Sequence, residues 1–157
     1  MLTNKFKINY SIGAVANGIK TDTFTFFLLF FYSNIIGLNP ALAGSAIFIA
    51  LCVDAVTDPL MGTISDRTNS SYGRRHPFMM ISFIPMSLGY IFLFAPRQDW
   101  DMSQSDLFIW MTIFTVITRI GMTLFDIPHR AFGGEVTKNY KERTILMSWR
   151  EMFGWVA

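Results

Sequence analysis

Long apolar runs, separated by short polar breaks, are the feature that most limits how this chain can fold. A transmembrane helix needs about 20 mostly apolar residues, and five segments of the sequence approach that length. Of the 157 residues, 52% are hydrophobic and only 15% are charged, whereas a soluble domain carries about 25% charged residues. A soluble fold could not cover so much apolar surface with polar side chains. We therefore expect an all-α integral membrane protein.

The expected helices are separated by turn-forming and charged segments. Gly and Pro mark residues 37–40, and Pro is favoured at the start of a helix. Residues 66–76, 96–101 and 133–143 supply the other polar breaks. The helices are expected to cover approximately residues 8–36, 40–65, 77–94, 106–132 and 144–157. Because the last segment is still apolar at Ala157, we expect the N-terminal part of a longer protein.

Basic residues gather at one end of this expected bundle. Lys5 and Lys7 precede the first helix, and the segments 66–76 and 133–143 carry further Lys and Arg. Lys and Arg concentrate on the cytoplasmic side of membrane proteins. We therefore expect a multi-pass protein of the cell membrane whose N-terminus and basic loops face the cytoplasm. The lipid bilayer is one expected partner. Nucleic acid is not expected, since no basic patch with interleaved aromatics is present.

Several charged residues remain at membrane depth once the loops are set aside. A charge at the bilayer centre costs at least about 2.5–3.5 kcal/mol, and such side chains usually face a cavity or a partner. This number of buried charges exceeds what membrane anchoring requires and indicates a polar pathway or site. The residues are Lys20, Asp22, Asp54, Asp58, Arg119, Asp126, Arg150 and Glu151.

Carboxylates on two of the expected helices form a candidate cation site. Asp54 and Asp58 are four residues apart and share one helix face. Two ionised carboxylates there repel each other, so they require a cation between them or a proton on one of them. Asp126 lies at a similar depth on the fourth helix, and Thr123 lies one turn before it. Hard cations prefer such oxygen ligands, so the pattern predicts a site for Na⁺ or a proton and no other metal or cofactor.

Two other interpretations of these carboxylates stay open. Arg119 and Arg150 could neutralise them, in which case no ion is transported, and whether Arg119 pairs with Asp126 is undecided. A catalytic acid/base pair is the third interpretation. No Ser or Cys nucleophile with a His partner appears, so the chain is not expected to be an enzyme. His76 and His129 are both expected at the surface, near the membrane edge.

A family resemblance emerges from these same segments. Residues 54–68 read DAVTDPLMGTISDRT, and residues 72–77 read YGRRHP. They resemble the second helix and following loop of the glycoside–pentoside–hexuronide:cation symporters, which are melibiose permease-like members of the major facilitator superfamily. Residues 126–150 resemble the fourth and fifth helices of that family, and the opening helix aligns without gaps.

The resemblance implies a major facilitator superfamily bundle, of which this chain would form the first five of twelve transmembrane helices. It also implies a secondary active transporter that carries a solute together with sodium or a proton. The expected solute is a small molecule, namely a sugar or a glycoside. Two alternatives remain: a carrier of lysolipids or other non-sugar solutes within the same superfamily, and a transporter-like receptor that binds solute without moving it.

For the cation, the resemblance points to the same four residues that the spacing selects, Asp54, Asp58, Thr123 and Asp126. The sugar contacts differ. The family's sugar-binding carboxylate on the first helix falls at Gly18 and its lysine neighbour falls at Asn17, while the aromatic positions on the fourth helix hold Met122 and Arg130. We therefore expect the solute to contact other polar residues. These are Asp22, Lys20, Arg150 and Arg119.

The loop after the second helix is expected to control the conformation of the carrier. Its pattern resembles the loop signature of the wider superfamily, and its arginines are expected to bind carboxylates at neighbouring helix ends and to stabilise one state. The residues of this expected conformational loop are Asp66, Arg67, Gly73, Arg74 and Arg75.

Overall fold

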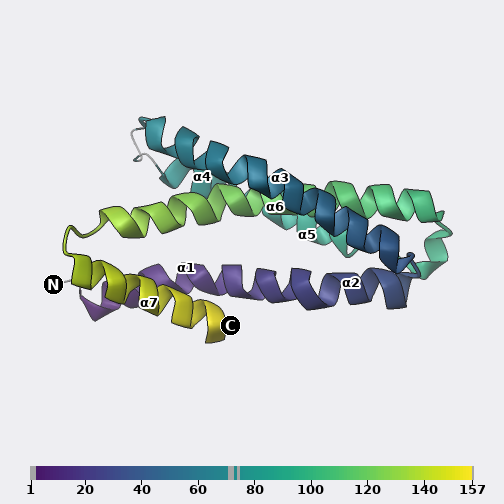
Figure 1. Ribbon diagram of the computed structural model, residues 1–157, viewed down its shortest axis with the longest axis horizontal. Helices are drawn as coiled ribbons and strands as arrows, with labels where there is room; N and C mark the ends of the chain where they lie inside the picture. Colours follow the sequence, from purple (N-terminus) through teal and green to yellow (C-terminus); the bar gives the residue numbers. More distant parts are fainter. Residues whose placement is uncertain (1–2, 71–72, 74, 157) are drawn as a thin grey trace.

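The computed structural model describes residues 3–70, 73 and 75–156. Within these ranges the side chains of Ala16, Asn17, Lys20–Asp22, Thr25 and Gln98 lie outside the description. Every regular element in the described ranges is helical. The helices lie lengthwise in one elongated bundle (Figure 1). This arrangement confirms the all-α bundle that the apolar runs predict.

The first expected span is a continuous helical path rather than a single α-helix. It begins at Asn4, earlier than expected, and it contains two π-helical turns. Gly37 ends the path at φ 89°, a left-handed conformation that glycine adopts at little cost. The segments in order are α1 (Asn4–Asp22), η1 (Thr23–Phe27), α2 (Leu28–Phe30) and η2 (Phe31–Ile36).

The second helix, α3 (Pro40–Arg67), starts where the turn residues predict. The Asn39 side chain accepts a hydrogen bond from the Ala41 backbone N–H at 2.9 Å, and Pro40 occupies the first turn, where its missing N–H is not needed. The third expected span is divided at Ser82 into α4 (His76–Ile81) and α5 (Phe83–Leu93).

The last two helices follow a short 3₁₀ turn, η3 (Gln98–Trp100). Ser103 caps the start of helix α6 (Gln104–Glu135), and its hydroxyl accepts a hydrogen bond from the Asp106 N–H at 3.2 Å. The helix continues beyond residue 132, where the sequence predicts an end. Helix α7 (Tyr140–Val156) closes the described chain.

Three helices in the described residues are long and apolar enough, by length and composition, to cross a membrane. They are Pro40–Arg67, His76–Leu93 and Gln104–Glu135. Large apolar side chains such as Phe48, Phe83 and Ile91 are exposed on them. Lipid is the solvent that such surfaces require, and this agrees with a membrane protein.

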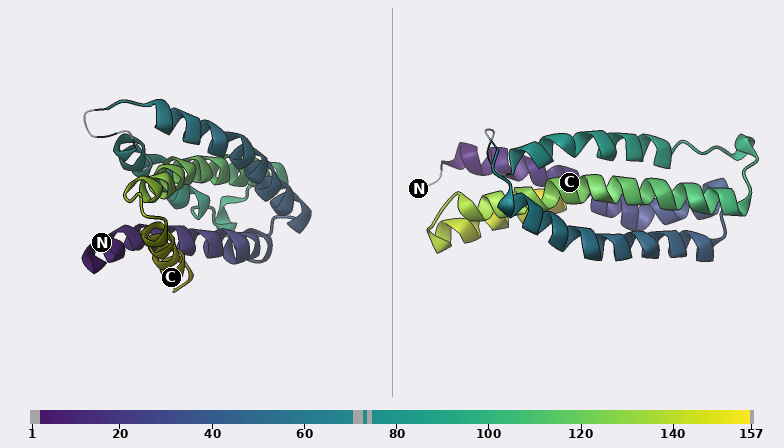
Figure 2. Two further views of the ribbon diagram at one scale, coloured as in Figure 1. Left: turned by 60° about the vertical axis from the view of Figure 1, so that its left-hand side comes forward. Right: turned by 90° about the horizontal axis from the view of Figure 1, so that it is seen from above.

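Helix α6 is the centre of one group of helices, because α3, α4 and α5 all pack on it. Helix α7 packs mainly on α1. Figure 1 shows that α3 and α6 run in the same direction, and the view from above in Figure 2 places α6 between α3 and α5. Side chains of α3 and α6 can therefore meet in register along the bundle.

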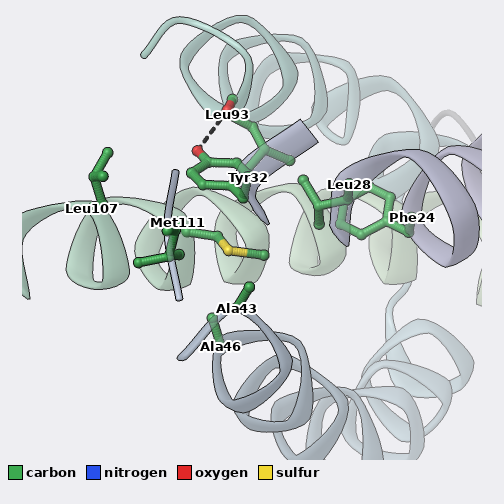
Figure 3. Close-up of a cluster of buried hydrophobic side chains, with 9 residues drawn as sticks. Phe24, Leu28, Tyr32, Ala43, Ala46, Leu93, Leu107 and Met111 are labelled. Atoms are coloured by element: carbon green, nitrogen blue, oxygen red, sulfur yellow. Dashed lines mark hydrogen bonds between the residues drawn. The ribbon is translucent and has the colours of Figure 1, made fainter. Parts of the chain in front are cut away.

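Buried apolar side chains join the first four expected spans at the end opposite the basic loops (Figure 3). Tyr32 is fully buried there, and its hydroxyl donates a hydrogen bond of 2.7 Å to the Leu93 carbonyl. Leu28 and Met111 pack in the same cluster. The cluster holds this end of the bundle together, so that polar residues deeper along α3 and α6 keep fixed positions.

We expect Gly89→Val to destabilise the protein by about 1–3 kcal/mol, the usual cost of overpacking. A Cβ at Gly89 meets the Thr118 hydroxyl at 2.3 Å and the Thr118 backbone nitrogen at 2.9 Å, so α5 must move away from α6. Small residues permit such close helix contacts in membranes. Thermal unfolding in detergent measures the effect. Gly44→Ala is the matched control, because nothing lies within 4 Å of its added Cβ. Equal melting temperatures for the two variants would contradict the close contact.

Candidate cation and solute site

Two polar contacts between side chains connect α3 to α6. Asp54 forms an ion pair with Arg119, and the Thr123 hydroxyl donates a hydrogen bond of 2.7 Å to Asp58. Both contacts join residues 65 positions apart. The four-residue spacing on α3 is thus matched by a four-residue spacing on α6, as parallel helices in register require.

The third carboxylate lies one turn further along α6. Asp126 binds Arg150 of α7 at 2.5 Å and Arg130 of its own helix at 2.7 Å. The Arg150 side chain is only 3% exposed and also donates to Glu151 at 2.6 Å. Asp126 therefore ties α6 to α7, and Arg119 does not pair with it. The sequence left that pairing undecided.

One small cavity brings the four expected cation ligands together. Asp54, Asp58, Thr123 and Asp126 line it with Ile127, and its volume is about 40 Å³. Roughly 10–15 Å³ suffices for one water-sized occupant, so the cavity has room for a small ion. The Oδ1 atom of Asp54 is buried without a hydrogen-bond partner. An unpaired buried carboxylate oxygen is costly, and a cation or a proton would satisfy it.

The three carboxylates differ in how their charges are balanced. Asp54 and Asp126 each have an arginine partner. Among the described residues, Asp58 has no ion-pair partner and accepts a hydrogen bond from neutral Thr123. No three acidic, His or Cys side chains of the described chain are grouped closely enough to hold a metal ion by themselves. A cation here would therefore rely on Asp58, a hydroxyl and one free oxygen of Asp54.

The expected solute contacts are only partly placed by the structure. Arg119 and Arg150 bind carboxylates of the cavity region rather than lining an open solute pocket. The side chains of Lys20 and Asp22 lie outside the described residues, so their contact with a solute stays a prediction. Both residues belong to α1, which packs on α7, the helix that carries Arg150.

Gly18 has a structural reason to lack a side chain. A Cβ at Gly18 would lie 2.0 Å from the carbonyl oxygen of Gly154 on α7. Real side chains do not approach backbone atoms that closely, so any larger residue separates α1 from α7. The position that resembles the family's sugar-binding carboxylate is thus used for helix packing.

His129 is buried rather than at the surface, so this expectation from the sequence is wrong. It is 5% exposed, and its ring stacks on that of Tyr10 with the centroids 4.5 Å apart. The Tyr10 hydroxyl donates to the His129 carbonyl at 3.0 Å. Gly13 makes room for the ring, since a Cβ there would lie 2.7 Å from Nε2. The gap left by a glycine on another helix is not visible from the pattern around His129.

The loop after α3 is organised around Arg75. Its guanidinium binds Asp66 at 2.8 Å and Glu135 at 2.7 Å, joining the ends of α3 and α6. Hydrogen bonding to Glu135 raises the pKa of Arg75, so its charge is retained. Gly73 has φ 93°, a conformation that favours glycine. Arg74 lies outside the described residues, and Arg67 is exposed at the end of α3 with no ion-pair partner in the described chain.

We expect Arg75→Ala to increase the accessibility of the basic end of the bundle, because it removes the bridge between Asp66 and Glu135. The rate at which a water-soluble thiol reagent labels a cysteine introduced at Thr68 measures the change, and a several-fold increase is expected. Arg67→Ala removes a loop arginine without breaking that bridge and is the matched control. Equal labelling rates in the two variants would count against a conformational role for Arg75.

Comparison with known proteins identifies relatives that match nearly the whole of this chain. An uncharacterized symporter of Synechocystis is 37% identical over 94% of this chain and 28% of its own length. A putative glycoside/cation symporter of Escherichia coli is 33% identical over 95% of this chain and 32% of its own length. The sodium-dependent lysophosphatidylcholine symporter 1-A of Danio rerio is 30% identical over 99% of this chain and 29% of its own length.

The chain thus spans about a third of the length of the curated relatives it matches. The family model described as MFS/sugar transport protein matches residues 9–157. Its match covers all of the described helices except the start of α1. The resemblance stated from the sequence and the observed helical bundle both agree with this family match. The chain belongs to the MFS/sugar transport protein family of the major facilitator superfamily.

Proposed function

We propose that this chain is part of a secondary active transporter that moves a sugar or glycoside together with sodium or a proton. The cavity shared by Asp54, Asp58, Thr123 and Asp126 carries the proposal. It lies between two helices that are apolar enough to cross a membrane. Carboxylates at that depth are costly unless they are compensated, and a transported cation provides such compensation.

Asp58 is the residue on which coupling depends in this proposal. Arginines already balance its two neighbouring carboxylates. Its own charge is left for a monovalent cation or a proton to balance. A receptor that does not transport solute has no need of such a site, which favours transport over binding alone. The basic loops are proposed to face the cytoplasm, as the distribution of Lys and Arg indicates.

Glycosides and lysolipids are the two candidate classes of solute. The name of the Escherichia coli relative supports a glycoside. The name of the zebrafish relative supports a lysolipid as the second candidate, and its match extends over 99% of this chain. Guanidinium groups bind both sugar hydroxyls and phosphate oxygens, so the expected solute contacts at Arg150 and Arg119 do not decide between the two classes.

The test is uptake of labelled solutes by vesicles that contain the intact protein. A panel of glycosides and a lysophosphatidylcholine is offered with sodium at constant pH, and then with an inward proton gradient without sodium. We expect uptake of at least one glycoside to increase with one of the two cations. Vesicles without the protein are the control for passive entry, which is largest for the lysolipid.

Stimulation of lysolipid uptake alone would replace the glycoside proposal with the second candidate. If the protein binds a solute of the panel but no cation changes either its binding or its uptake, the proposal of coupled transport is wrong.

A further inference from the structure

Arg119 is an arginine inside the bundle that directly contacts one of the expected cation ligands. It projects from α6, pairs with Asp54 of α3, and is 12% exposed. Its guanidinium carbon also lies 5.2 Å from the centre of the Phe24 ring. Phe24 is buried and belongs to the first helical path. The arginine is therefore held between a carboxylate and an aromatic face.

This environment holds the Arg119 guanidinium group in place. Arginine does not lose its proton in proteins, and an aromatic face within about 6 Å attracts a guanidinium group. The ion pair uses Oδ2 of Asp54, while Oδ1 remains buried without a partner beside the cavity. Asp54 therefore lines the cavity and keeps one oxygen without a hydrogen-bond partner, while Arg119 already balances its negative charge.

We propose that Arg119 acts as an internal cation that lowers the affinity of the Asp54–Asp58 cavity for the coupling ion. The inference rests on the proposed function, because it concerns the affinity of that same site. The positive charge of Arg119 already balances Asp54, so a second cation that enters the cavity gains less electrostatic attraction there. A weak site releases its ion readily, which transport requires.

The test is sodium binding to the intact protein at alkaline pH, where competition from protons is smallest. We expect Arg119→Gln to lower the sodium Kd about tenfold or more, because the full charge of Asp54 then faces the cavity. Arg119→Lys retains a positive charge and is expected to stay closer to the wild-type Kd. Asp54→Asn alone leaves Arg119 unpaired near the cavity, so it is expected to weaken sodium binding.

The double variant Asp54→Asn with Arg119→Gln distinguishes charge balance from direct coordination. If Arg119 acts as an internal cation, removing its charge restores much of the sodium binding that Asp54→Asn loses, since no unbalanced arginine remains. If the Asp54 carboxylate acts only as a direct ligand, the double variant binds sodium as weakly as Asp54→Asn. The double variant also avoids an unpaired buried charge, so it remains informative if Arg119→Gln does not fold.

Solute affinity at saturating sodium is the second readout. Two results together would overturn the inference. Arg119→Lys would lose much of its solute affinity, and the double variant would have the same sodium Kd as Asp54→Asn. Arg119 would then be assigned to solute binding. A wild-type protein that binds solute without any response to sodium or protons would instead contradict the proposed function. The two failures are therefore distinguishable.

Discussion

Asp58→Asn is expected to abolish the stimulation of solute binding by the coupling cation while leaving the protein folded. Asparagine keeps the shape of the side chain and can still accept the hydrogen bond from Thr123, which is 2.7 Å long in the native site. It removes the one carboxylate of the cavity that has no arginine partner in the described chain. Without that charge, a monovalent cation has no net negative site to balance.

The measurement is solute binding as a function of sodium concentration at fixed pH, repeated as a function of pH without sodium. Asp99→Asn is the matched control, because Asp99 is exposed in the turn between α5 and α6 and lies outside the cavity. We expect the control to retain the full cation response. A normal sodium response in Asp58→Asn would remove Asp58 from the site.

Melibiose at millimolar concentration is expected not to displace the true solute of this protein. Sites that hydrogen-bond sugar hydroxyls through a carboxylate reject partners that leave such groups unpaired, and charge-assisted hydrogen bonds are about twice as strong as neutral ones. Gly18 supplies no such carboxylate. Competition between melibiose and the labelled solute measures the effect, with the unlabelled solute as the positive control.

Restoring an acid at this position is not expected to create a melibiose site. A Cβ at Gly18 would lie 2.0 Å from the Gly154 carbonyl, so Gly18→Asp forces α1 and α7 apart and lowers the melting temperature. Melibiose binding by the wild-type protein, unaffected by Asp22→Ala, would show that the solute contacts have been wrongly assigned. Binding gained by a stable Gly18→Asp variant would contradict the close helix contact.

The sequence was sufficient for the helical architecture and for the grouping of the expected cation ligands. Apolar length predicts the three helices of the described residues that are long and apolar enough to cross a membrane, where no water satisfies the backbone. The spacing of Asp54 and Asp58 places both side chains on one face, and α3 turns that face towards α6. Because α3 and α6 run parallel, Asp126 and Thr123 lie at a similar depth on α6 and line the same cavity.

The pairing of charges could not be derived in the same way. Which arginine meets which carboxylate depends on how the helices are rotated and shifted relative to one another, and periodicity within one helix does not contain that information. Arg119 and Asp126 share a helix face by spacing, yet Arg119 pairs with Asp54 across the helix interface. By contrast, the contact between Asp126 and Arg130, four residues apart on α6, follows directly from the spacing.

The most direct test of coupled transport is accumulation of the identified solute against its concentration gradient. Vesicles containing the intact protein are loaded with equal solute on both sides, and an inward gradient of sodium or protons is then applied. We predict that the internal solute concentration increases above the external concentration and that an ionophore for the coupling cation abolishes the increase. Solute that only equilibrates across the membrane, whichever cation gradient is applied, would contradict coupling through the carboxylates of α3 and α6.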